Sequence, residues 1–257
     1  MKVLRTKSSS NAVSIKADRA KIGDAILYSA FLLVICWTVF ILDEYLGYQL
    51  KQYGLKPRVP EGLRGIFTIH FLHGDLDHIV QNSLALFVLN SFVFYFYRSI
   101  ALPVFATMFF LSPVLLWFAG RDGNHIGASV LIYAEFAFLF VSGLIRKNPV
   151  LLRVALVVVL YYGSLVWYVF PVDKKVSWEG HACGFFVGVL AAFWWREKGP
   201  QRKQYQFESE PEMTDEEYAL WRARVGETQP PVETTVTVKY HYKSDDASDS
   251  KTNERLQ

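Results

Sequence analysis

Three short stretches of the sequence carry polar side chains of the kinds that catalyse acyl transfer. His78 and Asn82 are four residues apart, and so are Ser129 and Tyr133, so each pair would lie on one face of a helix. His181 stands in the third stretch. A hydroxyl, an imidazole and two side-chain donors are the parts of a serine hydrolase site, which needs a nucleophile, a general base and donors to an oxyanion.

The elements that must position these side chains are apolar helices. Of the 257 residues, 52% are hydrophobic, 16% are aromatic and only 20% are charged, which indicates a membrane protein. About 20 apolar residues are needed to cross the hydrocarbon core as a helix. Six spans are predicted, at residues 25–42, 79–97, 99–119, 129–144, 149–171 and 180–195. The predicted fold class is all-α: a polytopic membrane protein with a bundle of six transmembrane helices.

The same composition excludes two classes of protein. Cys36 and Cys183 both lie in apolar runs, so the chain is not a secreted scaffold stapled by disulfides. The basic residues form no patch interleaved with aromatic residues, so no nucleic-acid partner is expected. The expected surroundings are therefore a lipid bilayer.

The distribution of lysine and arginine predicts the orientation of the spans. With the N-terminus in the cytoplasm, the inner segments hold 14 of these residues near the spans and the outer segments hold seven. This bias favours cytoplasmic N- and C-termini. The spans at 79–97, 129–144 and 180–195 would then all run from outside to inside, with the three polar stretches near the outer leaflet. Because the span at 129–144 is short, Ser129 is expected below the membrane surface.

Charge divides the chain into three predicted parts. Residues 1–24 form a cytoplasmic arm, residues 25–196 form the membrane domain, and residues 197–257 form a cytoplasmic tail. The tail holds 22 of the 51 charged residues and is expected to be largely disordered. Within it, a capping-box sequence predicts a short helix near 214–225, and alternating apolar residues at 234–243 are typical of a strand.

The polar stretches extend into three motifs in a fixed order. They are His73-x4-His78-x3-Asn82, Gly127-x-Ser129 with Tyr133, and His181-x2-Gly184-x3-Gly188. On these motifs the chain resembles the rhomboid intramembrane serine proteases, over about residues 20–196. The resemblance implies the rhomboid helical bundle and a serine endopeptidase of a bacterial cell membrane. It further implies that the protein needs no cofactor and cleaves transmembrane proteins near the outer membrane face. The oligomeric state stays open.

The resemblance also implies a role for each site residue. Ser129 would be the nucleophile and His181 its general base, without a third carboxylate. Tyr133 would stack on the His181 ring. His78 and Asn82 would hold the oxyanion together with the Ser129 backbone N–H. Supporting roles, in addition to that of Tyr133, fall to His73, Gly127 and Gly184.

Val130 departs from the family's pattern, which usually has glycine directly after the nucleophile. Its β-branched side chain is expected to push the helix at 129–144 away from the helix at 180–195. The contact between Ser129 and His181 would then lengthen.

Two other interpretations remain open. Histidines and aspartates crowd residues 70–78, which suggests a zinc site; however, His73 and His78 are five apart and do not share a helical face. The second alternative is a catalytically inactive rhomboid-like protein that binds transmembrane segments. Val130 favours that alternative, whereas the presence of Ser129 and His181 favours the protease.

Overall fold

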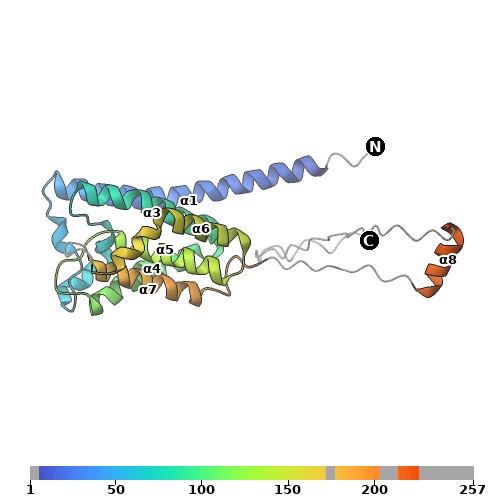
Figure 1. Cartoon of the computed structure of the whole chain (residues 1–257). Helices are drawn as coiled ribbons and strands as arrows, with labels where there is room; N and C mark the ends of the chain where they lie inside the picture. The colour runs from blue at the N-terminus through green and yellow to red at the C-terminus, as the bar shows by residue number, and fades with distance from the viewer. Residues whose placement is uncertain (1–5, 172–176, 203–213, 226–257) are drawn as a thin grey trace. The chain divides into compact units, whose positions relative to one another are not determined.

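A computed structural model describes residues 6–171, 177–202 and 214–225 of the chain. Within these residues every regular element is a helix, and the predicted polytopic helical bundle is confirmed. Six helices build the membrane domain: α1 (Thr6–Glu44), α3 (Leu76–Phe96), α4 (Ala101–Ala119), α5 (Ser129–Ile145), α6 (Pro149–Tyr162) and α7 (Trp178–Trp194) (Figure 1). Shorter helical pieces connect them: η1 (Leu50–Tyr53), η2 (Pro60–Arg64), α2 (Gly65–Thr68), η3 (Ile69–Phe71), η4 (Arg98–Ile100) and η5 (Gly163–Val169).

The lengths of the helices agree with most of the predicted spans. Four segments of the described chain are long and apolar enough to cross a membrane: Asp18–Glu44, Leu76–Phe96, Arg98–Ala119 and Pro149–Val169. The helix α5 is apolar but has only 17 residues, and α7 also has 17. The helix α1 continues well before the predicted span, because hydropathy marks the apolar length of a helix and not the residue at which it begins.

The helix α5 lies at the centre of the bundle (Figure 1). It packs against α3, α4, α6 and α7, and residues 130–139 are all buried. By contrast, α1 packs mainly on α3 and exposes much of its surface. The helix that begins with Ser129 is therefore enclosed by protein.

Two glycines let α7 approach α5 backbone to backbone. A Cβ atom added to Gly184 would collide with the carbonyl oxygen of Val130, and one added to Gly188 would collide with that of Ala134. Because the glycines are one turn apart, they form a groove along α7 that receives α5. This close approach sets the spacing of the helices that carry Ser129 and His181.

Replacing Gly188 by alanine is expected to lower the melting temperature of the purified protein in detergent. The added Cβ would also lie 2.9 Å from the Ala137 Cβ, so the two helices must separate. Inserting a methyl group into a packed interior costs about 1–3 kcal/mol. Gly23→Ala in α1 is the control, since nothing lies within 4 Å of its added Cβ and alanine favours helix. Equal melting temperatures for the two variants would contradict the close packing.

The segment between α1 and α3 and the loop between α4 and α5 lie at the same end of the bundle (Figure 1). A β-bridge joins them: the Leu55 N–H donates to the His125 carbonyl at 2.9 Å, and the His125 N–H donates to the Leu55 carbonyl at 2.8 Å. The Gly127 N–H donates to the Ile69 carbonyl at 2.9 Å. The loop that leads into Ser129 is therefore held in place by the segment before α3.

Residues 203–257 form a separate unit, of which the structure describes the helix α8 (Asp215–Val225). The start of α8 has the reciprocal hydrogen bonds of a capping box. The Glu217 N–H donates to Thr214 Oγ1 at 3.3 Å, and the Thr214 N–H donates to Glu217 Oε2 at 3.0 Å. The strand expected at 234–243 and the end expected to be disordered lie outside the described residues.

Candidate active site

The three polar stretches come together at the end of the bundle where α3, α5 and α7 begin. Ser129 is the first residue of α5, His78 is the third of α3 and His181 is the fourth of α7. Asn82 and Tyr133 each follow one turn further along their helices.

His181 is held by two contacts. Its ring is stacked on that of Tyr133, with the centroids 4.0 Å apart and the planes within 6° of parallel. Its Nδ1 lies 2.9 Å from the carbonyl oxygen of Tyr168, in η5. A carbonyl oxygen only accepts hydrogen bonds, so Nδ1 carries the hydrogen and Nε2 of the neutral ring keeps its lone pair. His181 is therefore in the tautomer that a general base acting through Nε2 needs.

Gly127 lets the ring of His78 approach the backbone just before Ser129. Its φ is +123°, a backbone conformation that favours glycine. A Cβ atom added there would lie 2.7 Å from His78 Nε2 and 3.6 Å from Ser129 Oγ. Because glycine has no Cβ, the imidazole nitrogen fits there, and the Ser129 hydroxyl lies beside the same glycine. This arrangement can present a hydrogen-bond donor to a carbonyl group that Ser129 attacks.

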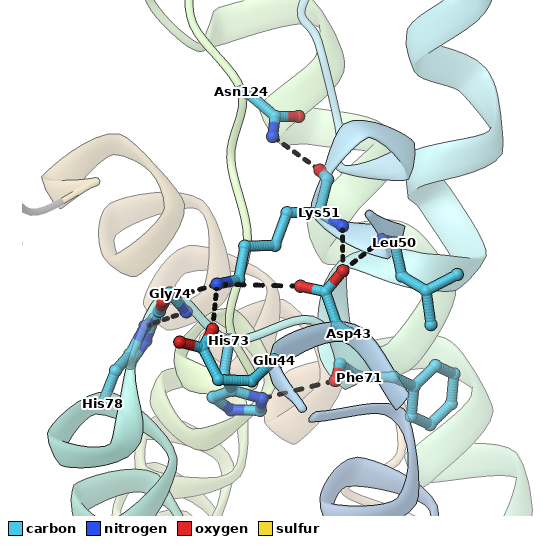
Figure 2. Close-up of polar contacts among 9 residues, drawn as sticks. All are labelled: Asp43, Glu44, Leu50, Lys51, Phe71, His73, Gly74, His78 and Asn124. Atoms are coloured by element: carbon cyan, nitrogen blue, oxygen red, sulfur yellow. Dashed lines mark hydrogen bonds and ion pairs between the residues drawn. The ribbon is translucent and has the colours of Figure 1, made fainter. Parts of the chain in front are cut away.

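The ring of His78 is held by a hydrogen bond at its other nitrogen, Nδ1 (Figure 2). The Gly74 N–H donates to His78 Nδ1 at 3.3 Å, so the hydrogen of the neutral ring is on Nε2. The ring of His73 packs edge-on against that of His78, with the centroids 5.0 Å apart. Burial lowers the pKa of His73 to about 4, so its ring is neutral near pH 7. His73 Nδ1 in turn donates to the Phe71 carbonyl at 3.3 Å.

Two further donors lie at this end of the bundle, the side-chain amide of Asn82 and the backbone N–H of Ser129. Asn82 Nδ2 is buried and makes no hydrogen bond within the described residues. The N-terminus of α5 has no side-chain cap at Ala128, so the Ser129 N–H has no partner inside the helix. Asp75 and Ser177, by contrast, cap α3 and α7. An unpaired amide donor and an uncapped helix N-terminus are suited to a developing negative charge.

Ser129 and His181 are brought to one site but are not paired. In the described part of the chain, His181 makes its hydrogen bond to Tyr168 and none to Ser129. Hydrogen bonds between catalytic groups are often long without substrate and tighten in the complex. The arrangement is therefore compatible with a serine–histidine dyad.

The expected push of Val130 against α7 is not observed. The Val130 side chain is 2% exposed and belongs to an apolar cluster with Leu55, Ile69, Leu116 and Cys183. Its carbonyl oxygen is in direct contact with Gly184. The missing side chain at Gly184 makes room for α5 at this residue, so Val130 does not hold the two helices apart.

His125 links the start of α5 to the start of α7, a role that the sequence alone did not indicate. Its Nε2 donates to the Arg121 carbonyl at 2.9 Å, so its Nδ1 accepts from the Ser177 hydroxyl at 2.6 Å. Ser177 also accepts from the Gly180 N–H at 3.3 Å as the N-cap of α7. An ion pair between Arg121 and Glu179, at 3.4 Å, adds a second link. A serine before an apolar helix signals a cap, but its distant histidine partner has no signal in the sequence.

Glu135, also on α5, is set apart from these contacts. It is fully buried, and neither carboxyl oxygen has a hydrogen-bond partner within the described residues. No three or more His, Cys, Asp or Glu side chains of the described residues are grouped so as to hold a metal ion. The histidines before α3 therefore form no metal-binding cluster there.

Comparison with known proteins identifies a family for this region of the chain. The family model of the rhomboid domain matches residues 60–198, a range that contains all the site residues above. Uncharacterized proteins of Mycobacterium bovis and Mycobacterium tuberculosis are each 31% identical over 168 residues, 62% of this chain and 70% of theirs. An uncharacterized protein of Mycobacterium leprae is 30% identical over 171 residues, 63% of this chain and 67% of its own.

Proposed function

Because the chain belongs to the rhomboid family, we propose that it is an intramembrane serine endopeptidase that hydrolyses transmembrane proteins through Ser129 and His181. One observation carries the proposal. The Ser129 hydroxyl and His78 Nε2 both lie beside Gly127, so a nucleophile and a hydrogen-bond donor are near each other. The fixed tautomer of His181 supplies the base that such a nucleophile needs.

The proposed reaction begins with proton transfer to His181. Its Nε2 takes the hydroxyl proton of Ser129 as Oγ attacks the carbonyl carbon of the scissile bond. The Tyr168 carbonyl accepts from Nδ1–H and stabilises the imidazolium, in the place that a carboxylate takes in a triad. His181 then gives the proton to the leaving amine, and water hydrolyses the acyl-enzyme. Stacking on Tyr133 keeps the ring in position for both transfers.

Three donors are proposed for the oxyanion that forms during the attack. They are the backbone N–H of Ser129, Nε2–H of His78 and Nδ2–H of Asn82. The uncapped start of α5 and the unpartnered Asn82 amide support this assignment, because each donor is available to an incoming oxygen.

We further propose that the site lies near the outer face of a bacterial cell membrane, with both termini in the cytoplasm. The excess of lysine and arginine near the inner ends of the spans supports this orientation. The substrates would be transmembrane proteins, cleaved near the outer ends of their spans. The domain boundaries proposed from charge, at 1–24, 25–196 and 197–257, complete this arrangement.

A fluorophosphonate probe is expected to label the wild-type protein but neither Ser129→Ala nor His181→Ala. Only a serine hydroxyl activated by a base attacks the probe, and labelling is measured by in-gel fluorescence of protein purified in detergent. Ser83→Ala is the matched control; its hydroxyl donates to the Ile79 carbonyl on α3 and accepts from Trp37 Nε1 on α1, away from Ser129, and labelling should persist. Labelled Ser129→Ala would place the reactive group elsewhere. An unlabelled wild type would favour the inactive rhomboid-like protein that binds transmembrane segments.

A further inference from the structure

Lys51 joins the end of α1 to the start of α3, although it belongs to neither helix (Figure 2). Its Nζ lies 2.7 Å from Glu44 Oε2 and 3.7 Å from Asp43 Oδ2. The same Nζ donates to the Gly74 carbonyl at 2.8 Å. The hydrogen bond to Glu44 is the main cause that raises the pKa of Lys51, so the side chain stays charged. A cation anchored on α1 therefore holds a backbone carbonyl just before α3.

The backbone of Lys51 is itself fixed on two sides. The Asp43 carboxylate, whose side chain is only 5% exposed, accepts from the N–H groups of Leu50 and Lys51. Asn124, in the loop that leads to Ser129, donates from Nδ2 to the Lys51 carbonyl at 2.7 Å. Lys51 therefore reaches Gly74 from a rigid base that is also tied to the nucleophile's loop (Figure 2).

Gly74 connects Lys51 to His78. Glycine has the widest backbone freedom of any residue, so its peptide groups need an external restraint to keep one direction. The Gly74 N–H must point at His78 Nδ1 to make its 3.3 Å hydrogen bond. The charge-assisted bond from Lys51 restrains the carbonyl on the other side of the same Cα. Without that bond, Gly74 can rotate and its N–H can leave the imidazole.

The direction of the Gly74 N–H decides the chemistry of His78. A ring that accepts at Nδ1 carries its hydrogen on Nε2, whereas a hydrogen on Nδ1 would face the Gly74 hydrogen directly. Nε2 is the ring nitrogen that lies against Gly127, near Ser129 Oγ. Only the tautomer with hydrogen on Nε2 can donate a hydrogen bond on the side of the ring that faces Ser129.

We propose that Lys51 is a positioning residue that, through Gly74, holds His78 in the tautomer with hydrogen on Nε2. Lys51 acts through His78 and does not touch the substrate. The effect of Lys51 on catalysis rests on the proposed function. The effect of Lys51 on the tautomer of His78 does not depend on that function. The two are therefore tested by separate measurements.

NMR of the full-length protein with ¹⁵N-labelled histidine, in detergent micelles, measures the ring tautomers directly. The His78 signal is identified by its loss in His78→Gln. In the wild type, His78 is expected to have hydrogen on Nε2 and a bare Nδ1. In Lys51→Met the ring is expected to become a mixture of tautomers, whereas Lys51→Arg, which keeps a charged donor, should largely restore the wild-type signal. Lys56→Met is the matched control, because Lys56 follows in the same segment and makes no ion pair with the described residues.

An unchanged His78 tautomer in Lys51→Met, or a wild-type ring with hydrogen on Nδ1, would overturn the proposal. Should Lys51→Met not fold, Glu44→Gln replaces it. This change keeps the lysine and its Asp43 anchor, and it is expected to produce a smaller shift in the same direction.

Kinetics on a transmembrane reporter test the catalytic consequence. Lys51→Met is expected to lower kcat about tenfold, less than the loss of an oxyanion donor, which costs about 10²–10³-fold. KM should change little, because Lys51 does not touch the substrate. The melting temperature is expected to fall, because the buried Asp43 carboxylate loses its cation, so kcat is expressed per folded protein. A kcat that falls only in proportion to the folded fraction would reduce Lys51 to a structural residue. A wild type without turnover would contradict the proposed function, while the NMR measurement would still decide the role of Lys51.

Discussion

Ser129→Ala and His181→Ala are each expected to reduce cleavage of a transmembrane reporter to the background level. In the proposed mechanism, Ser129 supplies the covalent bond of the acyl-enzyme, and His181 is the base that activates it. Because a nucleophile and its base act as a unit, losing either one can cost about 10⁶-fold in rate. The measurement is product formation over time in proteoliposomes, with the wild type and both variants side by side.

The melting temperature of each variant shows whether the protein is still folded. Ser83→Ala is again the matched control and should cleave at the wild-type rate, since its hydroxyl bonds to the Ile79 carbonyl and to the Trp37 indole and to no residue of the site. Turnover clearly above background in both Ser129→Ala and His181→Ala would eliminate the dyad.

Asn82→Ala is expected to lower kcat by about 10²–10³ while KM and the melting temperature change little. The Asn82 amide has no partner within the described residues, so its removal breaks no hydrogen bond of the resting protein. The donor becomes important only when charge develops on the substrate oxygen, and such interactions affect kcat rather than binding. His78→Ala should behave similarly. The double variant should fall short of the product of the two losses, because both donors serve one oxygen.

Asn90→Ala provides the contrasting case on the same helix. Asn90 is buried, and its Nδ2 donates to Ser29 Oγ at 3.1 Å, which links α3 to α1. Its removal should lower the melting temperature and leave kcat of the folded protein unchanged. Asn82 would be reassigned to a helix cross-link if its alanine variant behaved like that of Asn90.

Hydropathy was sufficient to predict the bundle because a lipid environment leaves few alternatives to helices that satisfy their own backbone groups. The spacing of polar residues predicted which side chains of α3 and α5 lie together. Residues four apart share a helical face. The sequence therefore predicts that Ser129 lies on the same face as Tyr133, and His78 on the same face as Asn82. His181 on α7 was indicated by its residue type, and the rhomboid resemblance implied its role as the general base.

The contacts that the sequence did not indicate are mostly made by backbone atoms. The Tyr168 carbonyl and the Gly74 N–H fix the tautomers of two histidines, and any residue type offers the same groups. The close packing of α5 on α7 at Val130 depends on Gly184 of the other helix, so the size of Val130 alone does not indicate it. Arg146 was counted only as a marker of orientation. It is buried and donates to the carbonyl groups of Trp195, Lys198 and Pro200.

The enclosure of α5 has a consequence for how the protein responds to membranes of different thickness. Helices that face lipid adjust to hydrophobic mismatch by tilting or by deforming the bilayer around them. The helix α5 is buried from residue 130 to residue 139 and has almost no lipid-facing surface there to match. Its 17 residues are therefore fitted to the neighbouring helices rather than to the hydrocarbon core. A change in lipid chain length acts first on the outer helices and reaches Ser129 only through their packing on α5.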